Sequence, residues 1–564
     1  MYKILINKIL IFFFLNLISF SLSAQTEFKW DKTFTKADSL RGKLSPFRSC
    51  YDVTYYDLNL KIDIGKQAIS GYNDIYFEAK TDFSTLQIDL FEAMNVKKMV
   101  FNGDIEVAYK RIESTNAIFV TLPETRKGTK GILRIYYDGK PRKAINAPWD
   151  GGFSWKKDSK KNDWVGVSCE GIGASLWWPC KDHLSDEPDS MRINVSVPKA
   201  YMCVSNGNLK SQKPDNEGYM TYDWRISYPI NSYNVTLNIA NYAHFSDIHT
   251  YKDGTKLTCD YYVLPENLAR AKKHFVQVHT MLDAYDHYFG KYPFLRDGYC
   301  LVETPYLGME HQGAIAYGNK YMRGYLGERI PSDMNWDYII VHESGHEYWG
   351  NSISCDDHAD MWIHESFTTY MEALFVEQTM SYKDAVRYLL MQRNDIEGHD
   401  PMVGPRDVNF DDWQGSDIYY KGAWMLHTLR STIDDDKVFF GLLRSYYDLH
   451  KISVVNTQSF IDYVNTYTKK DYTYFFNQYL YQAGVPKLEY KLTPCGKNFE
   501  LNYRWANTNE DFRMPLKIKI GQYGKKIFPT KSWQTKPMKV KEGQALDFGL
   551  DRFLIDVQAM DVKD

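Results

Sequence analysis

Apolar and polar residues alternate in short stretches over the first part of the chain, from about residue 45 to residue 249. Residues 51–64 contain several alternations with a period of two, and 191–197 and 235–240 repeat the pattern between clusters of Gly, Asn and Pro. Successive side chains of a strand point to opposite faces of a sheet, so this period predicts half-buried strands. We therefore expect a large, mostly antiparallel N-terminal β domain over 25–249.

The spacing of apolar residues becomes helical near Glu266. Residues 266–288 predict one amphipathic helix that ends at Gly290, a residue suited to closing helices. Further helices are expected over 333–349, 364–380, 382–396, 417–433, 436–450, 457–467 and 470–482. Pro486 ends this region, and short alternating strands such as 516–520 follow. The pattern predicts a multidomain α+β chain, with a mainly helical domain over 250–485 and a small C-terminal β-sandwich-like domain over 486–564.

The first 24 residues differ in composition from the rest of the chain. Lys3 and Lys8 precede an almost entirely apolar run over 9–20, and small residues follow up to Ala24. These features are typical of a secretory signal peptide over 1–24, which predicts cleavage after Ala24. The run is short for a membrane span, so no integral membrane anchor is expected after cleavage. The mature protein is expected to be exported, to the periplasm or the medium.

Composition narrows the classes of function. The formal net charge of −3 gives no sign of the basic surface that nucleic-acid binding requires, so no nucleic-acid partner is expected. The eight cysteines form no Cys-x-x-Cys pair, so a thiolate zinc site is not indicated. Nothing in the composition indicates an oligomeric state.

Residues 342–346 read His-Glu-Ser-Gly-His and carry the strongest chemical signal. Residues i and i+4 of a helix share a face, so His342 and His346 can both bind one zinc ion. Glu343 lies one position further round, where it can act on the attacking water as a general base. Asp333 stands at the start of the predicted helix and is the candidate for its N-cap.

A catalytic zinc site needs a third protein ligand and an open fourth position. A histidine ten positions after His342, as in collagenase-like enzymes, is excluded because Ser352 stands there. A glutamate on the following helix is the other solution, and Glu365 lies 19 positions after His346. The competing candidates in the same stretch are His358, Asp360 and His364.

The runs HESGHEYWGNSIS and WIHESFTTYMEAL resemble the gluzincin aminopeptidases, the aminopeptidase N family, which includes the leukotriene-hydrolase branch. The metal signature of that family is H-E-x-x-H, eighteen residues and then Glu, a spacing that this chain shares. The resemblance implies one zinc ion per chain, held by His342, His346 and Glu365, with Glu343 as the base. It also implies a thermolysin-like fold for the helical catalytic domain.

The segment Gly308-Met309-Glu310-His311 resembles the family's Gly-x-Met-Glu-Asn motif, with His311 in place of Asn. By this resemblance Gly308, Met309 and Glu310 bind substrate, and Glu310 holds its free α-amino group. A carboxylate at a fixed distance from the metal would set the register of the scissile bond.

Two more segments resemble motifs of this family. Residues 169–171 and the following 178–182 resemble its Gln-x-Glu-Ala and Pro-Cys-x-Asp segment, which implies Glu170 as a second amine anchor. Residues 419–422 resemble its Tyr-x-Lys-Gly motif, which implies that Tyr419 donates a hydrogen bond to the oxyanion of the transition state. The neighbouring Tyr420 is the rival candidate.

The resemblance implies a zinc aminopeptidase that acts on peptides with a free N-terminus, and the predicted signal peptide implies that it is exported. A zinc endopeptidase without amine anchors, an epoxide hydrolase and a binding protein that has lost the chemistry are the alternatives. The intact residues His342, Glu343, His346 and Glu365 disfavour the binding protein. Many family members have a long C-terminal helical domain, which is not expected over 486–564, so the resemblance leaves the depth of the cleft open.

Overall fold

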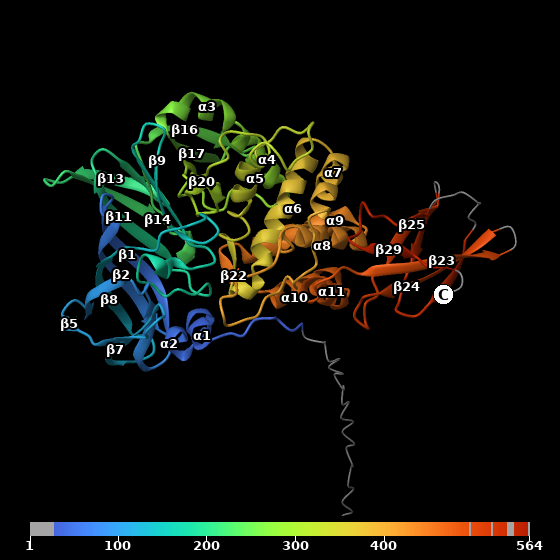
Figure 1. Ribbon diagram of the computed structural model, residues 1–564, viewed down its shortest axis with the longest axis horizontal. Coiled ribbons are helices and arrows are strands. Elements are labelled where there is room, and N and C mark those ends of the chain that lie inside the picture. The colour runs from blue at the N-terminus through green and yellow to red at the C-terminus, as the bar shows by residue number, and fades with distance from the viewer. Residues whose placement is uncertain (1–27, 496–497, 521–522, 539–545, 562–564) are drawn as a thin grey trace, which may run out of the picture.

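The computed structural model describes residues 28–495, 498–520, 523–538 and 546–561. The predicted signal peptide lies outside these ranges. A β-rich region, a helical region and a second β-rich region follow one another along the chain, and Figure 1 shows them side by side in that order. This arrangement confirms the predicted multidomain α+β class.

An eight-stranded sheet dominates the N-terminal region. In spatial order its strands are β13 (Asn208–Pro214), β14 (Tyr219–Ile226), β11 (Ser190–Pro198), β1 (Tyr51–Asp63), β2 (Ala68–Ala79), β8 (Lys130–Gly139), β4 (Met94–Phe101) and β5 (Ile105–Glu106). All neighbours are antiparallel except β1 and β11. In β1, buried residues such as Leu58, Leu60 and Ile62 alternate with partly exposed ones, as the period of two predicts.

Two smaller sheets carry the segments that reach the site. A four-stranded sheet contains β12 (Met202–Val204), β15 (Asn238–Ala240), β10 (Asp163–Ser168) and β9 (Gly152–Lys157). A five-stranded sheet contains β16 (Ala243–Thr250), β17 (Lys256–Val263), β18 (Tyr299–Glu303), β20 (Ile315–Tyr317) and β19 (Gly308–Met309). The domain boundary expected at residue 249 falls inside β16, whose hairpin partner is β17. Because β10 and β19 end just before Glu170 and Glu310, both acids emerge from strand ends.

The single helix expected over 266–288 is wrong in one respect. The chain forms α3 (Leu268–His274) and α4 (Gln277–Tyr288), which are separated by two residues. Phe275 is buried at this break while Val276 is exposed. The predicted end is observed, because the N–H of Gly290 donates to the carbonyl of Asp286 and Gly290 has φ of +99°.

Seven more helices complete the helical region. They are α5 (Tyr338–Gly345), α6 (Trp362–Thr379), α7 (Tyr382–Arg393), α8 (Tyr420–Ile433), α9 (Asp436–His450), α10 (Thr457–Thr468) and α11 (Thr473–Tyr481). Every residue of α6 from Trp362 to Val376 is buried, and α6 packs against α4, α5, α7 and α8 (Figure 1). A helix buried on all sides is a rigid support for the polar groups that it carries.

The C-terminal region consists of two small sheets. The first contains β27 (Gln534–Met538), β24 (Asn498–Ala506), β23 (Lys487–Cys495) and β29 (Asp556–Ala559), and the second contains β26 (Tyr523–Ile527), β25 (Leu516–Ile520) and β28 (Leu546–Asp547). In β25, the buried Leu516, Ile518 and Ile520 alternate with exposed lysines, which confirms the predicted strand.

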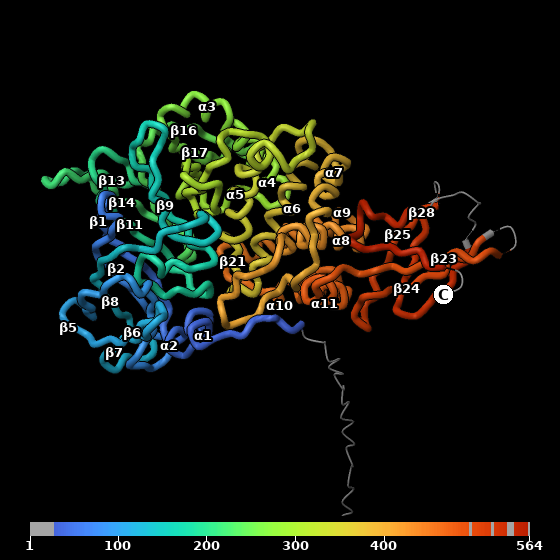
Figure 2. Tube along the Cα trace, in the orientation of Figure 1, coloured from blue at the N-terminus to red at the C-terminus, as the bar shows by residue number. Residues whose placement is uncertain are grey.

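The segment that precedes α1 (Lys36–Gly42) runs back along the helical region (Figure 2). The rings of Trp30 and Phe410 lie 4.6 Å apart, and Lys32 pairs with Asp412. Within the described residues, no helix is long and apolar enough to cross a membrane.

Candidate metal centre and substrate cleft

The N-terminus of α5 is fixed by Asp337. The carboxylate of Asp337 is completely buried and accepts a hydrogen bond from the backbone N–H of Ile340. The expected cap, Asp333, was wrong, because its carboxylate lies outside the helix and pairs with Arg387. Tyr317 also donates to Asp337, so the start of the helix is set by a buried network that spacing alone does not reveal.

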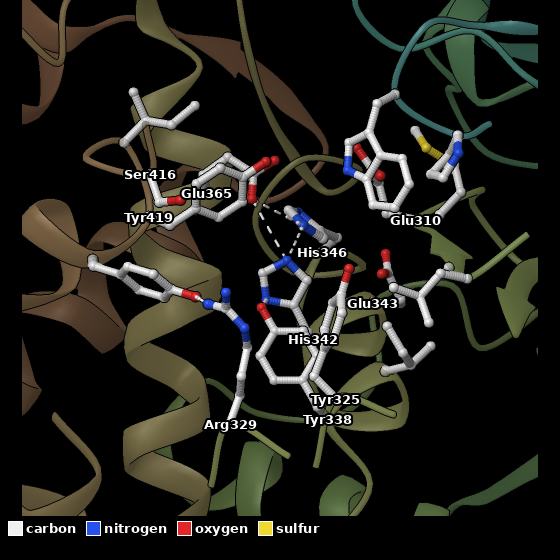
Figure 3. Close-up of a pocket in the computed structure, with 18 of the residues that line it drawn as sticks. Glu310, Tyr325, Arg329, Tyr338, His342, Glu343, His346, Glu365, Ser416 and Tyr419 are labelled. Carbon is white, nitrogen blue, oxygen red and sulfur yellow. Dashed lines mark hydrogen bonds and ion pairs between the residues drawn. The ribbon is translucent and has the colours of Figure 1, made fainter. Parts of the chain in front are cut away.

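The structure brings His342, His346 and Glu365 to one point (Figure 3). The two Nε2 atoms of the histidines, which come from the end of α5, lie 3.2 Å apart. Oε2 of Glu365, from the first turn of α6, lies 3.6 Å from Nε2 of His342 and 3.5 Å from Nε2 of His346. All three side chains are buried.

This cluster fits a zinc ion. Two imidazole nitrogens and one carboxylate oxygen within 4.8 Å of one another form the donor set of a catalytic zinc site. Oε2 of Glu365 is buried without a hydrogen-bond donor among the described residues. A buried carboxylate oxygen without a donor is costly, and a bound cation would remove that cost.

Two of the other candidates for the third ligand are engaged elsewhere. Nε2 of His364 accepts from the backbone N–H of Cys355, and Asp360 pairs with Arg406. His358 is buried and lies outside both ligand groups found among the described residues. The second of those groups combines Glu310, Glu343 and His346. It shares His346 with the first group and contains one histidine fewer.

Each histidine is oriented by its second ring nitrogen. Nδ1 of His342 lies 2.6 Å from Oε1 of Glu372, and Nδ1 of His346 lies 3.0 Å from the carbonyl oxygen of Trp349. Because these oxygens only accept, the protons sit on Nδ1 and both Nε2 lone pairs face the cluster. Such partners fix the tautomer and raise the basicity of metal ligands.

Glu372 was missed at the sequence level. It lies seven residues after Glu365, two turns along the same face of α6, and this spacing is the signal that could have found it. Its other oxygen accepts from the hydroxyl of Tyr388 and from Nε2 of Gln392, so Glu372 is held on both sides.

Replacing Glu372 with glutamine is expected to weaken zinc binding roughly 10–100-fold, because His342 loses its charged acceptor. Zinc affinity would be measured by competition with a coloured chelator. The matched control is Glu377→Gln on the same helix, where the carboxylate pairs with Arg430 instead. Equal affinities for Glu372→Gln and the unmodified protein would show that Glu372 does not support the metal site.

Glu343 faces the cleft beside the cluster. Burial raises the pKa of Glu343 to about 7, against the opposing effect of the neighbouring His342 and His346. A side-chain carbon at Gly308 would collide with Oε1 of Glu343, so the carboxylate could keep its present place only next to a glycine. Gly308 therefore makes room for the carboxylate that was expected to be the base.

Glu310 and Glu170 line the same cavity, which has a volume of about 550 Å³. Oε1 of Glu310 accepts from the hydroxyl of Tyr233 at 3.0 Å. Burial, together with the nearby Glu310 and Glu365, raises the pKa of Glu170 well above its ordinary value. Two carboxylates that repel each other in a buried cleft form a site that an ammonium group would stabilise.

The remaining expected residues fall into two groups. Met309 and Tyr419 line the cavity, and Figure 3 places Tyr419 beside Glu365. Tyr420 also lines the cavity, but its hydroxyl accepts a hydrogen bond from Nη1 of Arg329. His311 is buried outside the cavity lining, and burial lowers its pKa to about 3, so it stays neutral.

Two family models match the chain. The Peptidase M1 N-terminal domain matches residues 53–234, and the Peptidase family M1 domain matches residues 274–479. Together they cover most of the N-terminal sheets, apart from β15, β16 and β17, and most of the helical region, including every residue assigned to the cleft.

Curated relatives include aminopeptidases and a hydrolase. The chain is 22% identical over 422 residues to leucyl aminopeptidase of Saccharolobus solfataricus. This alignment covers 72% of this chain and 50% of that relative. It is 21% identical over 494 residues to leukotriene A-4 hydrolase of Xenopus laevis, and this alignment covers 82% of this chain and 76% of that relative. The chain therefore spans half the length of the first relative and about three quarters of the second.

Solved structures share the fold. A variant of the M1 zinc metallopeptidase from Deinococcus radiodurans, bound to a Tyr-Ser-Ala substrate, matches with a TM-score of 0.65 and 22% identity. The match covers 79% of this chain and 98% of that one. Another structure of the metallopeptidase from the same organism matches with a TM-score of 0.61 and 24% identity, over 74% and 90% of the two chains.

Proposed function

The chain belongs to the M1 family of peptidases, and from this premise we propose that it is a zinc aminopeptidase that removes N-terminal residues from peptides. The observation that carries the proposal is the placement of Glu310 and Glu170 in one cavity with the cluster of His342, His346 and Glu365. Acids that can bind an α-ammonium group next to a hydrolytic metal site favour cleavage of the first peptide bond. The peptide ligand of the Deinococcus radiodurans metallopeptidase supports peptides as the substrate class.

The residues divide the reaction between them. His342, His346 and Glu365 would hold zinc, which when bound supplies a Lewis acid for the scissile carbonyl and for the activation of water. Glu343 takes the proton of the attacking water and later transfers it to the leaving amine. Tyr419 donates to the oxyanion that develops on the carbonyl, while Glu310 and Glu170 hold the ammonium group in register.

Substrates with a blocked N-terminus test the proposal. With purified protein beginning at Gln25, aminoacyl amides of Ala, Leu, Met, Arg and Tyr are expected to be cleaved and their N-acetylated forms not. Activity should vanish with a chelator and return with added zinc. Glu310→Gln should lower kcat/KM for the free amines roughly 10–100-fold through a higher KM, because a charged hydrogen bond is lost.

Equal cleavage of free and acetylated substrates would contradict the amine anchors and favour an endopeptidase. If no amide is cleaved while zinc is bound, the epoxide-hydrolase alternative is favoured. The similarity to leukotriene A-4 hydrolase of Xenopus laevis is the reason for retaining this alternative. The carboxylates that line the cleft favour an amine substrate over both.

We also propose that the protein is exported. The support is the positive, apolar and small-residue pattern of residues 1–24. Fractionation of expressing cells with N-terminal sequencing should yield a mature chain that begins at Gln25, and an intact Met1 in the cytoplasm would contradict the proposal.

A further inference from the structure

Arg329 is the only lysine or arginine among the described residues that line the cleft. The other charged lining groups, apart from histidines, are the carboxylates of Glu170, Glu310, Glu343, Glu365, Asp395 and Asp411. In Figure 3, Arg329 and Glu310 lie on opposite sides of His342 and His346. The positive charge of Arg329 therefore stands across the two histidines from Glu310.

The loop before α5 presents Arg329 in a fixed way. Arg329 has φ of +57°, a left-handed conformation that arginine rarely adopts. The guanidinium of Arg323 holds this loop from inside by donating to the carbonyl oxygens of Gly327, Ile330, Pro331 and Met334. A strained residue of this kind persists only where its surroundings enforce it, and such residues gather at ligand sites.

The guanidinium of Arg329 uses only one of its three nitrogens in hydrogen bonds to the described residues. Nη1 lies 3.3 Å from the hydroxyl of Tyr420 and 3.5 Å from Oδ2 of Asp395. Among the described residues, no hydrogen bond from Nε or Nη2 is found. The side chains of Arg329 and Asp395 are 56% and 53% exposed, and exposed ion pairs of this kind contribute little. The planar fork of Arg329 can therefore receive an incoming carboxylate with two hydrogen bonds.

We propose that Arg329 forms a carboxylate-binding subsite that selects short peptides with a free C-terminus. The inference rests on the proposed aminopeptidase function, in which the ammonium group sits at Glu310 and Glu170 and the scissile bond at the metal cluster. The leaving part of the peptide then extends toward Arg329. An extended chain advances about 3.3–3.6 Å per residue, so only a short peptide places its terminal carboxylate within the cleft.

Charge repulsion makes this cation necessary for such substrates. A terminal carboxylate at the Arg329 end of the cleft has the carboxylate of Asp395 beside it, and like charges in a partly desolvated site disfavour binding. Among the described lining residues, Arg329 is the only lysine or arginine whose positive charge can offset this repulsion. A peptide whose C-terminus is amidated neither needs this compensation nor gains from it.

The test compares a tripeptide acid with its C-terminal amide. Both carry the N-terminal residue that the protein cleaves fastest from aminoacyl amides, and the released amino acid is quantified by chromatography. We expect kcat/KM to favour the acid roughly 10–100-fold, mainly through KM. Arg329→Asn should bring the acid-to-amide ratio close to one, because asparagine tolerates the left-handed backbone but carries no charge.

Two further variants sharpen the comparison. Arg329→Lys should keep part of the preference, because an ammonium retains the charge but not the planar fork. Arg126→Asn, at an exposed arginine of the N-terminal region whose side chain is 78% exposed, should keep the full preference.

Three results would overturn the subsite, and they are distinguishable. If no aminoacyl amide is cleaved, the proposed function fails and the subsite falls with it. If aminoacyl amides are cleaved but the unmodified protein treats acid and amide alike, the function stands and the subsite does not. If Arg329→Asn weakens both substrates equally, Arg329 only supports its neighbours Tyr420 and Asp395.

Discussion

Replacing Glu343 with glutamine is expected to lower kcat by about 10²–10⁴-fold while zinc stays bound. Glutamine has the same shape as glutamate but cannot take a proton from water or transfer one to the leaving amine. The space next to Gly308 admits either side chain, so the fold should not change. Turnover on the best aminoacyl amide and zinc content by elemental analysis are the two measurements.

Glu347→Gln is the matched control for this substitution. Glu347 lies one turn further along and accepts from the backbone N–H of Gly313, outside the cavity lining. Burial raises the pKa of Glu347 to about 8, so the amide resembles its neutral form. Substantial turnover by Glu343→Gln would remove Glu343 from the role of base.

The zinc content of Glu343→Gln also separates the two possible ligand groups. If His342, His346 and Glu365 hold the ion, the substitution leaves every ligand in place. If Glu310, Glu343 and His346 hold it, one ligand is lost and the zinc content should fall. Retained zinc with lost turnover is the result expected from the first group.

The metal cluster could be predicted because its geometry is mostly local. His342 and His346 share a face of one helix, which spacing alone reveals. The choice of Glu365 over its neighbours came from family resemblance, and the structure gives a physical reason for it: the first turn of α6 points Glu365 at the histidines, whereas His364 turns toward Cys355.

Features that depend on tertiary contacts escaped prediction. Asp337 rather than Asp333 caps α5, and its carboxylate is held by Tyr317 and Asn319, which lie about 20 residues earlier in the chain. The break between α3 and α4 falls where Phe275 is buried and Val276 is exposed, which the spacing of apolar residues did not indicate. Arg329 belongs to an irregular loop whose path is set by the hydrogen bonds of Arg323, so sequence spacing carried no signal for it.

Replacing Tyr419 with phenylalanine is expected to lower kcat by about 10²–10³-fold with little change in KM. The hydroxyl is needed only when the oxyanion develops, so its loss affects the transition state and not the bound substrate. Burial, reinforced by the nearby Glu365, raises the pKa of Tyr419 well above its ordinary value, which keeps the hydroxyl protonated as a donor. Steady-state kinetics on an aminoacyl amide give kcat and KM separately.

Tyr420→Phe decides between the two neighbouring tyrosines. The hydroxyl of Tyr420 is engaged by Arg329, whereas the ring of Tyr419 lies 6.2 Å from the ring of His342. An aminoacyl amide carries no carboxylate for Arg329, so its turnover reports on the oxyanion donor alone. A larger loss of kcat in Tyr420→Phe than in Tyr419→Phe would transfer the role to Tyr420. A similar small loss in both would mean that no tyrosine hydroxyl stabilises the oxyanion, and that the metal site carries this charge without help from either side chain.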